Sequence, residues 1–537
     1  MAIHSRLIPI PDKKVSYKKG KNGTLYVYFT TRAYRRKKDG QPTSDEVCIG
    51  KKDPKSGMLV PNKKYLDMFG TIEDFLPGMT SRIFGSGYIL KKKAEVLGIT
   101  RIVQQVFPRQ WQEILLAASY MVLKGNVMMY LDDFCEMYVT DTQLDSQGAS
   151  ELFASLSEAQ MNAFFVHWTA KVQEQEYLAY DVTSISSYSE QMEEVEYGYN
   201  RDGENLPQLN IGMFYGEQSQ RPVYYMLYSG SIPDKTHLEY MLRNANQLGI
   251  HRVTFVMDRG FATQENIDYF MELPYSLILC LPAGQKIFTQ LVESVSASIK
   301  SAAHWIPGHD LYGVKVTQSV YGRILDVHIF YSLELELNRR KELHDYVGRL
   351  EKELSEMCDK KKNYRRFERF FNITATGDRT IQYEMNPQKV DEVMKTAGFF
   401  AFATDRTDLT PNQLLTYYRH KDGIEKVFHH SKNDLDFSRL KTHYTETTNG
   451  KYFVGFIALI LYCDILNQIK SGPKEISKMT VKKVLLQMDK IRVMSSSRED
   501  RSYLLNPLTK KQKDILRSLA LNPDEFLEEA RNLNRIL

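Results

Sequence analysis

The spacing of hydrophobic and polar residues changes along this chain, and these changes predict its elements. From about 88 to 175, apolar residues recur at helical spacing, which predicts a helical region. From 177 to 281 the apolar runs are short, and turn residues and two helix-like segments separate them. Their order is a cluster of strands, then a helix, a strand, a helix and a strand. This order predicts an α/β sheet that begins with antiparallel strands.

Three further stretches complete the pattern. After about 285 the regularity stops, and a core-strand pattern returns only at 398–405. We therefore interpret roughly 286–395 as a β-rich mixed insertion that divides the α/β domain. The most apolar run, 452–466, contains an Asp and is too short to span a bilayer comfortably, which favours a buried helix. A helical tail is expected from about 471.

Composition adds limits on the class of protein. A chain of 537 residues is too long for one core, and 42% hydrophobic with 26% charged residues is ordinary for a soluble globular protein. The five cysteines lie far apart, which argues against a zinc module or a disulfide framework and fits a reducing cytoplasm. The first residues have no apolar core of signal-peptide length.

Positive charge is concentrated at the N-terminus. Residues 1–64 contain 16 Lys and Arg against 5 Asp and Glu, although the net charge of the whole chain is only +5. Such a cluster is typical of a segment that meets polyphosphate, although a solvated basic face fits about equally well. Within it, 24–50 contains two strand-like runs joined through an Asp-Gly turn, which predicts a β-hairpin that could contact DNA. The expected turn carries four basic residues: Arg35, Arg36, Lys37 and Lys38.

Two carboxylates lie where apolar strands do not ordinarily place them. The stretch "VTFVMDRGF" (253–261) is a buried-strand pattern that stops on Asp258, and functional groups in open α/β sheets gather beyond such strand ends. Asp258 could instead be a turn former or a helix cap, although Thr263 is the better cap for the next helix. Asp181 lies inside the apolar run "EYLAYDVTSI", where a carboxylate must be paired or bound to metal unless the strand is an edge strand in water.

A third stretch, 410–435, places charged residues on one side of an expected helix. Thr410 followed by Pro is a good helix start. Tyr418, Lys421, Glu425 and Lys432 recur at helical spacing and form one stripe. Such a stripe could be a row of surface ion pairs, or its carboxylate could hold a cation while the basic groups hold phosphate.

Taken together, the three stretches resemble a known family. The blocks "YDVTS", "VMDRGF" and "YRHKDGIEKVFHHSK", in this order, are similar to the catalytic blocks of DDE transposases of bacterial and archaeal insertion sequences. The nearest group has the signature Y-x2-R-x3-E-x6-K and a large insertion before its catalytic Glu. Tyr418, Lys421, Glu425 and Lys432 keep the spacing, with Lys421 in place of Arg, which retains the charge but loses the bidentate fork.

The resemblance implies a catalytic site. Asp181, Asp258 and Glu425 would be catalytic and would bind two Mg²⁺ ions, for which Mn²⁺ is expected to substitute. Tyr418, Lys421 and Lys432 would hold DNA phosphates. Trp305, in the insertion, is a candidate to stack on a flipped base, although a core position is the favoured interpretation for a Trp.

The resemblance also implies an RNase H-like catalytic fold and gives the predicted segments their roles. They are a basic β-rich DNA-binding region (1–70), a helical region that binds DNA ends (71–174), the first part of the catalytic domain (175–285), the insertion (286–395), the second part of the catalytic domain (396–470) and a helical C-terminal region (471–537).

The implied function is that of an insertion-sequence transposase. It would bind the terminal inverted repeats, cleave double-stranded DNA at the element's ends and join the 3′ ends to target DNA as a homodimer. A metal-dependent nuclease without strand transfer and a transposase-derived DNA-binding protein are the alternatives. No P-loop pattern occurs, so no nucleotide cofactor is expected, and no membrane partner is expected either. The expected location is the cytoplasm of a bacterium or archaeon, at the nucleoid.

Overall fold

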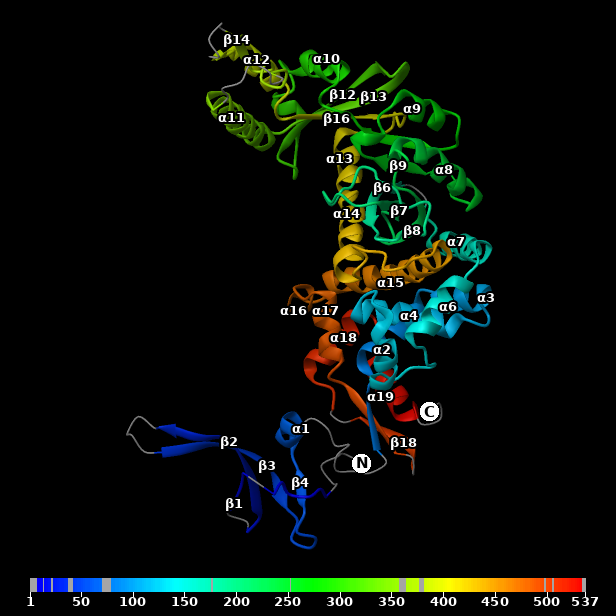
Figure 1. Ribbon diagram of the computed structural model, residues 1–537, viewed down its shortest axis with the longest axis vertical. Helices are drawn as coiled ribbons and strands as arrows, with labels where there is room; N and C mark the ends of the chain where they lie inside the picture. The colour runs from blue at the N-terminus through cyan, green and yellow to red at the C-terminus, as the bar shows by residue number, and fades with distance from the viewer. Residues whose placement is uncertain are drawn as a thin grey trace. The chain divides into compact units, whose positions relative to one another are not determined.

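The chain divides into two compact units (Figure 1). The computed structural model describes residues 7–12, 14–20, 23–36, 42–69, 79–174, 177–251, 253–356, 364–375, 381–496, 499–504 and 507–533. One unit comprises Met1–Phe164, Asn433–Phe437 and Tyr444–Leu537, and the other comprises Phe165–Lys432 and Ser438–His443. We call them the outer-chain unit and the central unit. All three expected catalytic carboxylates lie in the central unit.

A nine-stranded mixed sheet forms the centre of the central unit. Its strands, in spatial order, are β11 (Trp305–Ile306), β12 (Leu311–Val320), β13 (Arg323–Tyr331), β16 (Phe399–Thr404), β10 (Ser276–Cys280), β9 (Thr254–Met257), β6 (Tyr177–Ser186), β7 (Gln208–Gly216) and β8 (Pro222–Ser229). Strands β6, β7 and β8 form an antiparallel meander, β9 runs parallel to β6, and β10 runs parallel to β9. The expected α/β class, with an antiparallel beginning to the sheet, is confirmed.

Helices follow the strands in the order that the sequence predicts. They are α7 (Glu158–Val172), which leads into this unit, α8 (Asp234–Gln247), α9 (Gln264–Met271), α10 (Lys286–Val295), α11 (Leu333–Ser355), α12 (Pro387–Met394), α13 (Pro411–His420) and α14 (Asp422–His429). Helix α8 connects β8 to β9, and α9 connects β9 to the parallel strand β10. Helix α9 therefore forms the crossover connection that two parallel strands require.

The expected insertion is only partly separate from this sheet. Strands β12 and β13 pair with each other, and β13 pairs with β16, so they extend the central sheet. Hydrogen bonding along β13, which is buried over most of its length, therefore makes 305–331 continuous with the α/β sheet. Only the later part of 286–395 has its own core. There α11 and α12 pack with the hairpin of β14 (Phe371–Ala375) and β15 (Ile381–Met385), through Val347, Leu350, Leu354, Phe367, Phe370, Phe371, Val390 and Met394.

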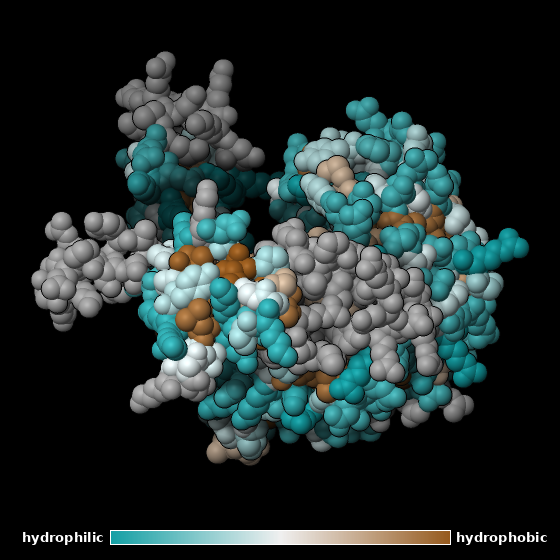
Figure 2. Space-filling model, turned by 90° about the horizontal axis from the view of Figure 1, so that it is seen from below, coloured by the Kyte–Doolittle hydropathy of each residue, from teal (hydrophilic) through white to brown (hydrophobic). Residues whose placement is uncertain are grey.

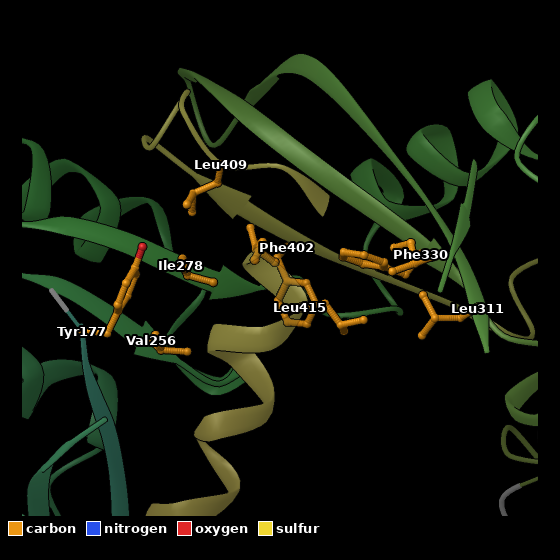
Figure 3. Packing of buried hydrophobic residues seen from close by; sticks show 10 residues of the cluster. Tyr177, Val256, Ile278, Leu311, Phe330, Phe402, Leu409 and Leu415 are labelled. Carbon is orange, nitrogen blue, oxygen red and sulfur yellow. The ribbon is translucent and has the colours of Figure 1, made fainter. Parts of the chain in front are cut away.

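One hydrophobic cluster fixes α13 against the sheet (Figure 3). Leu415 of α13 is buried beside Phe402 of β16. Leu414 of α13 and Ile278 of β10 belong to the same buried cluster. Thr410 begins the helix with a reciprocal capping box to Gln413, so the expected helix start is confirmed. This packing determines where the residues that follow α13 enter the site.

The outer-chain unit contains two small sheets and most of the remaining helices. The N-terminal sheet has the order β1 (Val15–Lys19), β2 (Leu25–Arg36), β3 (Pro42–Lys52), β4 (Leu59–Pro61), and α1 (Lys63–Phe69) follows it. The second sheet has the order β18 (Glu499–Leu504), β17 (Arg492–Ser496), β5 (Met79–Ile83). The helices are α2 (Gly85–Val96), α3 (Ile99–Val106), α4 (Trp111–Lys124), α5 (Leu131–Met137), α6 (Ser146–Ser155), α15 (Thr445–Ser471), α16 (Lys474–Ser477), α17 (Val481–Met488), α18 (Lys510–Ser518) and α19 (Pro523–Asn532).

Two expectations need correction in the outer-chain unit. The tail after 471 is not wholly helical, because β17 and β18 form an antiparallel pair there. The tail is also not separate from the helical region before 175, because β17 pairs with β5. Helix α15 packs within the outer-chain unit, and its expected place at the end of the catalytic domain stays a prediction. These differences have one reason. Pairing between segments far apart in the sequence decides which unit a segment joins, and local sequence patterns do not predict such pairing.

Helix α15 is the core helix of its unit. It is long and apolar enough to cross a membrane by length and composition, yet 83% of its most apolar window is buried. This burial confirms the expected buried helix. On the face shown in Figure 2, hydrophilic residues cover most of the described surface and hydrophobic ones form small patches.

The turn of the expected basic hairpin, residues 37–41, lies outside the described residues, and only the two strands beside it are described. Strands β2 and β3 are antiparallel neighbours, with register shifts along their length. Lys37 and Lys38 lie outside the described residues, as do the side chains of Arg35 and Arg36, so their contact with DNA stays a prediction.

Candidate active site

Asp181 is the one residue of β6 that is not fully buried. Its side chain is 21% exposed, and it interrupts a ten-residue strand whose other positions are all buried. Because β6 lies between β9 and β7, the alternative of an edge strand in water is wrong. Burial raises the pKa of the Asp181 carboxyl. The nearby Lys421 ammonium and the hydrogen bond from the Val182 N–H act in the opposite direction and reduce this rise. The structure therefore holds this carboxylate where a cation can neutralise it.

Asp258 directly follows β9 and lies level with Asp181. The parallel register pairs Ala179 with Val256, two residues before each Asp, so Asp181 and Asp258 come level with each other on neighbouring segments of the sheet. Asp258 accepts a hydrogen bond from the Arg259 N–H at 2.8 Å and caps a short 3₁₀ turn (Arg259–Phe261). Thr263 caps the helix that follows, as the sequence predicts. Asp258 therefore closes a turn and also faces the site.

Glu425 reaches the site from α14. Helix α13 ends at His420, Lys421 joins the two helices, and a π-helical turn (His430–Asp434) follows α14. Ile424 and Val427 are buried, which leaves the neighbouring Glu425 side chain 63% exposed. The expected stripe is therefore carried by two α-helices and a π turn instead of one continuous helix.

Lys421 brings the three carboxylates together around one atom. Its Nζ lies 3.3 Å from Asp181 Oδ2, 3.6 Å from Glu425 Oε1 and 4.0 Å from Asp258 Oδ2, and its side chain is only 3% exposed. Burial alone would lower the pKa of Lys421, but the three carboxylates outweigh burial and raise it. Lys421 is therefore a charged ammonium within the carboxylate cluster.

Tyr418 lies on the same side of the cluster. Its hydroxyl donates to Asp258 Oδ1 at 3.5 Å, and its ring packs on Phe402 with centroids 4.2 Å apart. Burial raises the pKa of Tyr418, so the phenol stays a neutral donor. Burial also raises the pKa of its neighbour Cys280 to about 11, which keeps that thiol protonated.

Lys432 pairs with a carboxylate outside the cluster. Its Nζ donates to both carboxylate oxygens of Asp202, at 2.8 and 2.7 Å. Asp202 belongs to the β6–β7 loop (187–207), where Glu204 also pairs with Arg439. Sequence reasoning did not single out Asp202, because its pairing with Lys432 spans 230 positions of the chain. Contact between Lys432 and a phosphate stays a prediction, and it requires Asp202 to release the ammonium.

Trp305 lies on β11, the edge strand of the large sheet. Its side chain is 40% exposed, and its ring meets Tyr312 edge-on with centroids 5.1 Å apart. The favoured interpretation of Trp305 as a core residue is therefore wrong, because an edge strand leaves the ring accessible. Stacking on a flipped base stays a prediction.

A cavity of about 500 Å³ adjoins the site. Its lining includes Arg259, which follows Asp258 in the sequence, Cys280, which is close enough to feel the charge of Asp258, and Arg339 and Tyr346 of α11. Local patterns did not predict it, because its walls come from segments far apart in the sequence.

The chemistry of these three side chains suits a divalent cation. Three carboxylates from β6, the end of β9 and α14 offer oxygen ligands that all lie within 4.0 Å of one atom. Mg²⁺ accepts a few carboxylates and completes its octahedron with water and phosphate oxygens. Asp181, Asp258 and Glu425 are the residues that would hold it.

Fold and site together define an α/β protein with a carboxylate cluster that spans neighbouring parallel strands and a following helix. The family model for the transposase DDE domain matches residues 173–461, more than half of the chain, and the chain belongs to this family. This family generally uses divalent metal ions, in agreement with the carboxylate cluster. Among solved structures, the chain is similar to piggyBac transposase in a synaptic complex with hairpin DNA, at 10% identity and a TM-score of 0.33, with 84% of this chain and 76% of that chain covered. No curated protein matches the sequence.

Proposed function

We propose that this protein is the transposase of an insertion sequence, which cleaves DNA at the element's ends and joins the 3′ ends to target DNA. One observation carries the proposal: Asp181, Asp258 and Glu425, within the region that the family model matches, converge around a single buried ammonium. Three carboxylates repel one another unless cations neutralise them, and one ammonium among three carboxylates leaves negative charge that a metal ion can bind.

The strand order supports an RNase H-like catalytic fold. The sheet contains β8-β7-β6-β9-β10, with the first three strands antiparallel and the last two parallel to β6. In this arrangement the first and fourth strands of the fold are neighbours and bring their carboxylates together. Asp181 and Asp258 occupy these two positions.

The chain's own residues then have distinct tasks. Asp181, Asp258 and Glu425 would hold two Mg²⁺ or Mn²⁺ ions, which would supply an activated attacking oxygen and stabilisation of the leaving oxygen of a phosphodiester. Tyr418 donates to Asp258 and orients that carboxylate. Lys432, once released from Asp202, would hold a phosphate of the DNA end.

Double-stranded DNA is the proposed partner, and a homodimer is the proposed assembly. The excess of Lys and Arg in residues 1–64 supports DNA binding, because cationic residues displace counterions from phosphates. Joining two ends requires both to be present together, and a dimer supplies one active site for each end. We place this activity in the cytoplasm of a bacterium or archaeon, at the nucleoid.

A strand-transfer assay with labelled transposon-end duplexes tests the proposal. Wild-type protein with Mg²⁺ should release 3′ ends and join them to target DNA, and the products should run with two chains per pair of ends in sizing experiments. Asp181→Asn, Asp258→Asn and Glu425→Gln should each lose cleavage by orders of magnitude and still shift the duplex in a gel. Asp345→Asn, which removes an exposed carboxylate on α11, is the matched control and should cut normally.

Each alternative function has its own outcome. Cleavage without joining would identify a nuclease. DNA binding without cleavage by the wild-type protein would identify a transposase-derived binding protein. Normal cutting by Asp258→Asn would show that Asp258 is only a turn residue.

A further inference from the structure

Lys421 has a position that a simple phosphate contact does not require. Its ammonium is buried at 3% exposure, and its three nearest carboxylate oxygens come from three different elements. A lysine that served only as a surface contact would extend its flexible stem and leave the charge in water. Here the backbone at the joint of α13 and α14 directs the side chain into the cluster instead.

The charges of this cluster depend on one another. Without the ammonium, three carboxylates would face one another, and Asp181 would be buried next to like charge. With it, each carboxylate has an opposite charge within 4.0 Å. A Lys ammonium is a compact point charge, so it can approach three oxygens at once, whereas the planar fork of Arg is suited to bidentate pairing.

We propose that Lys421 is a built-in counter-cation that holds the three carboxylates together and lowers their affinity for divalent metal. The inference rests on the proposed metal-dependent function. Mg²⁺ binds carboxylate oxygens at about 2.0–2.1 Å, and Lys421 Nζ lies 3.3–4.0 Å from the same oxygens. A metal ion that binds there must displace the ammonium or bind against its repulsion. Lys421 is thus a positioning residue that sets the metal affinity of the site.

Metal binding by the full-length protein without DNA tests this inference. Isothermal calorimetry with Mn²⁺, at a pH near 8, would compare wild type with Lys421→Gln and Lys421→Met, which remove the charge, and with Lys421→Arg, which keeps it. Both neutral variants should bind Mn²⁺ at least about tenfold more tightly, since a unit charge at this distance acts strongly in a partly buried site. Lys421→Arg should bind no more tightly than wild type.

A control variant separates this effect from a general change of charge. Lys426→Met removes an exposed ammonium from the same helix and should leave Mn²⁺ affinity within about twofold of wild type. Thermal unfolding would show that each variant is folded and that metal restores stability to the neutral variants. Loss of a merely structural residue would disorder the ligands and weaken binding, so the direction of the change is diagnostic.

The outcomes are distinct. Wild-type affinity, or weaker affinity, in both neutral variants would overturn the role of Lys421 and leave the proposed function intact. Failure of the folded wild type and the neutral variants alike to bind Mn²⁺ would overturn the metal-dependent function, and the inference with it.

Discussion

Gly423 tests whether the position of α14 is fixed by packing. It lies between Lys421 and Glu425, and a Cβ built on it would meet the ring of Tyr215 at 2.4 Å from Cε1 and 2.9 Å from Cζ. Tyr215 is only 7% exposed and is the next-to-last residue of β7, so its ring has little room to move. Gly423→Ala must therefore push α14 away from the sheet.

Two effects of opposite sign decide the stability of this variant. Ala in place of Gly favours a helix by up to about 1 kcal/mol. Overpacking of a well-packed site costs about 1–3 kcal/mol, and contacts with two atoms of one ring below 3.0 Å indicate the upper part of that range. We expect a net loss of about 2 kcal/mol, which lowers the melting temperature by roughly 4 °C in a unit of this size.

Gly348 provides the matched control. It lies inside α11, in the same unit, and a Cβ there would meet nothing within 4 Å. Gly348→Ala should therefore raise the stability by about 0.5–1 kcal/mol, through helix propensity alone. Differential scanning calorimetry of both variants measures the two signs in one experiment.

The packing argument also predicts coupling between the two residues. Tyr215→Leu removes the ring, so Gly423→Ala should be clearly less damaging in that background than in wild type. Gly423→Ala should also weaken Mn²⁺ binding, because α14 carries Glu425. A Gly423→Ala variant that is as stable as wild type would refute the reasoning and show that α14 adapts freely.

Three other perturbations follow from the same structure. Lys432→Ala should weaken binding to transposon-end DNA and leave Mn²⁺ affinity nearly unchanged. Asp202→Asn should strengthen DNA binding, because it releases the Lys432 ammonium. If Lys432→Ala lost as much metal affinity as a carboxylate variant, this assignment would be contradicted. His328 is fully buried, and burial lowers its pKa to about 4 from an ordinary value of 6.5. The neutral imidazole should therefore contribute its full stabilisation above about pH 6.5, and the free energy of unfolding should fall by up to about 3 kcal/mol as the pH drops to about 4. His328→Phe should flatten this part of a stability-against-pH curve, and an unchanged curve would count against this effect of His328. Deletion of residues 1–64 should weaken DNA binding and flatten its dependence on salt, since each neutralised phosphate adds about 0.9 to the log–log slope; an unchanged slope would exclude this segment as a DNA contact.

The helices and strands that carry the site, and the identity of its candidate ligands, were predictable from sequence patterns and motif spacing. Apolar residues on both faces predicted β9 as a buried strand, and its abrupt end marked Asp258. Thr410 with Pro411 predicted the start of α13. These signals are local, because strand and helix periodicity and capping depend on residues only a few positions apart.

How these residues meet depends on long-range packing that local patterns do not contain. The register between β6 and β9 sets Asp181 level with Asp258, and no local pattern encodes a register between strands more than 70 residues apart. Lys421 contacts Asp181 across 240 positions, and this contact, not the helical stripe, gives the lysine its place among the carboxylates. A π-helical turn then ends the α-helical spacing before Lys432, which pairs with Asp202 instead. Spacing in a sequence fixes the face of one helix, whereas long-range packing decides what that face meets.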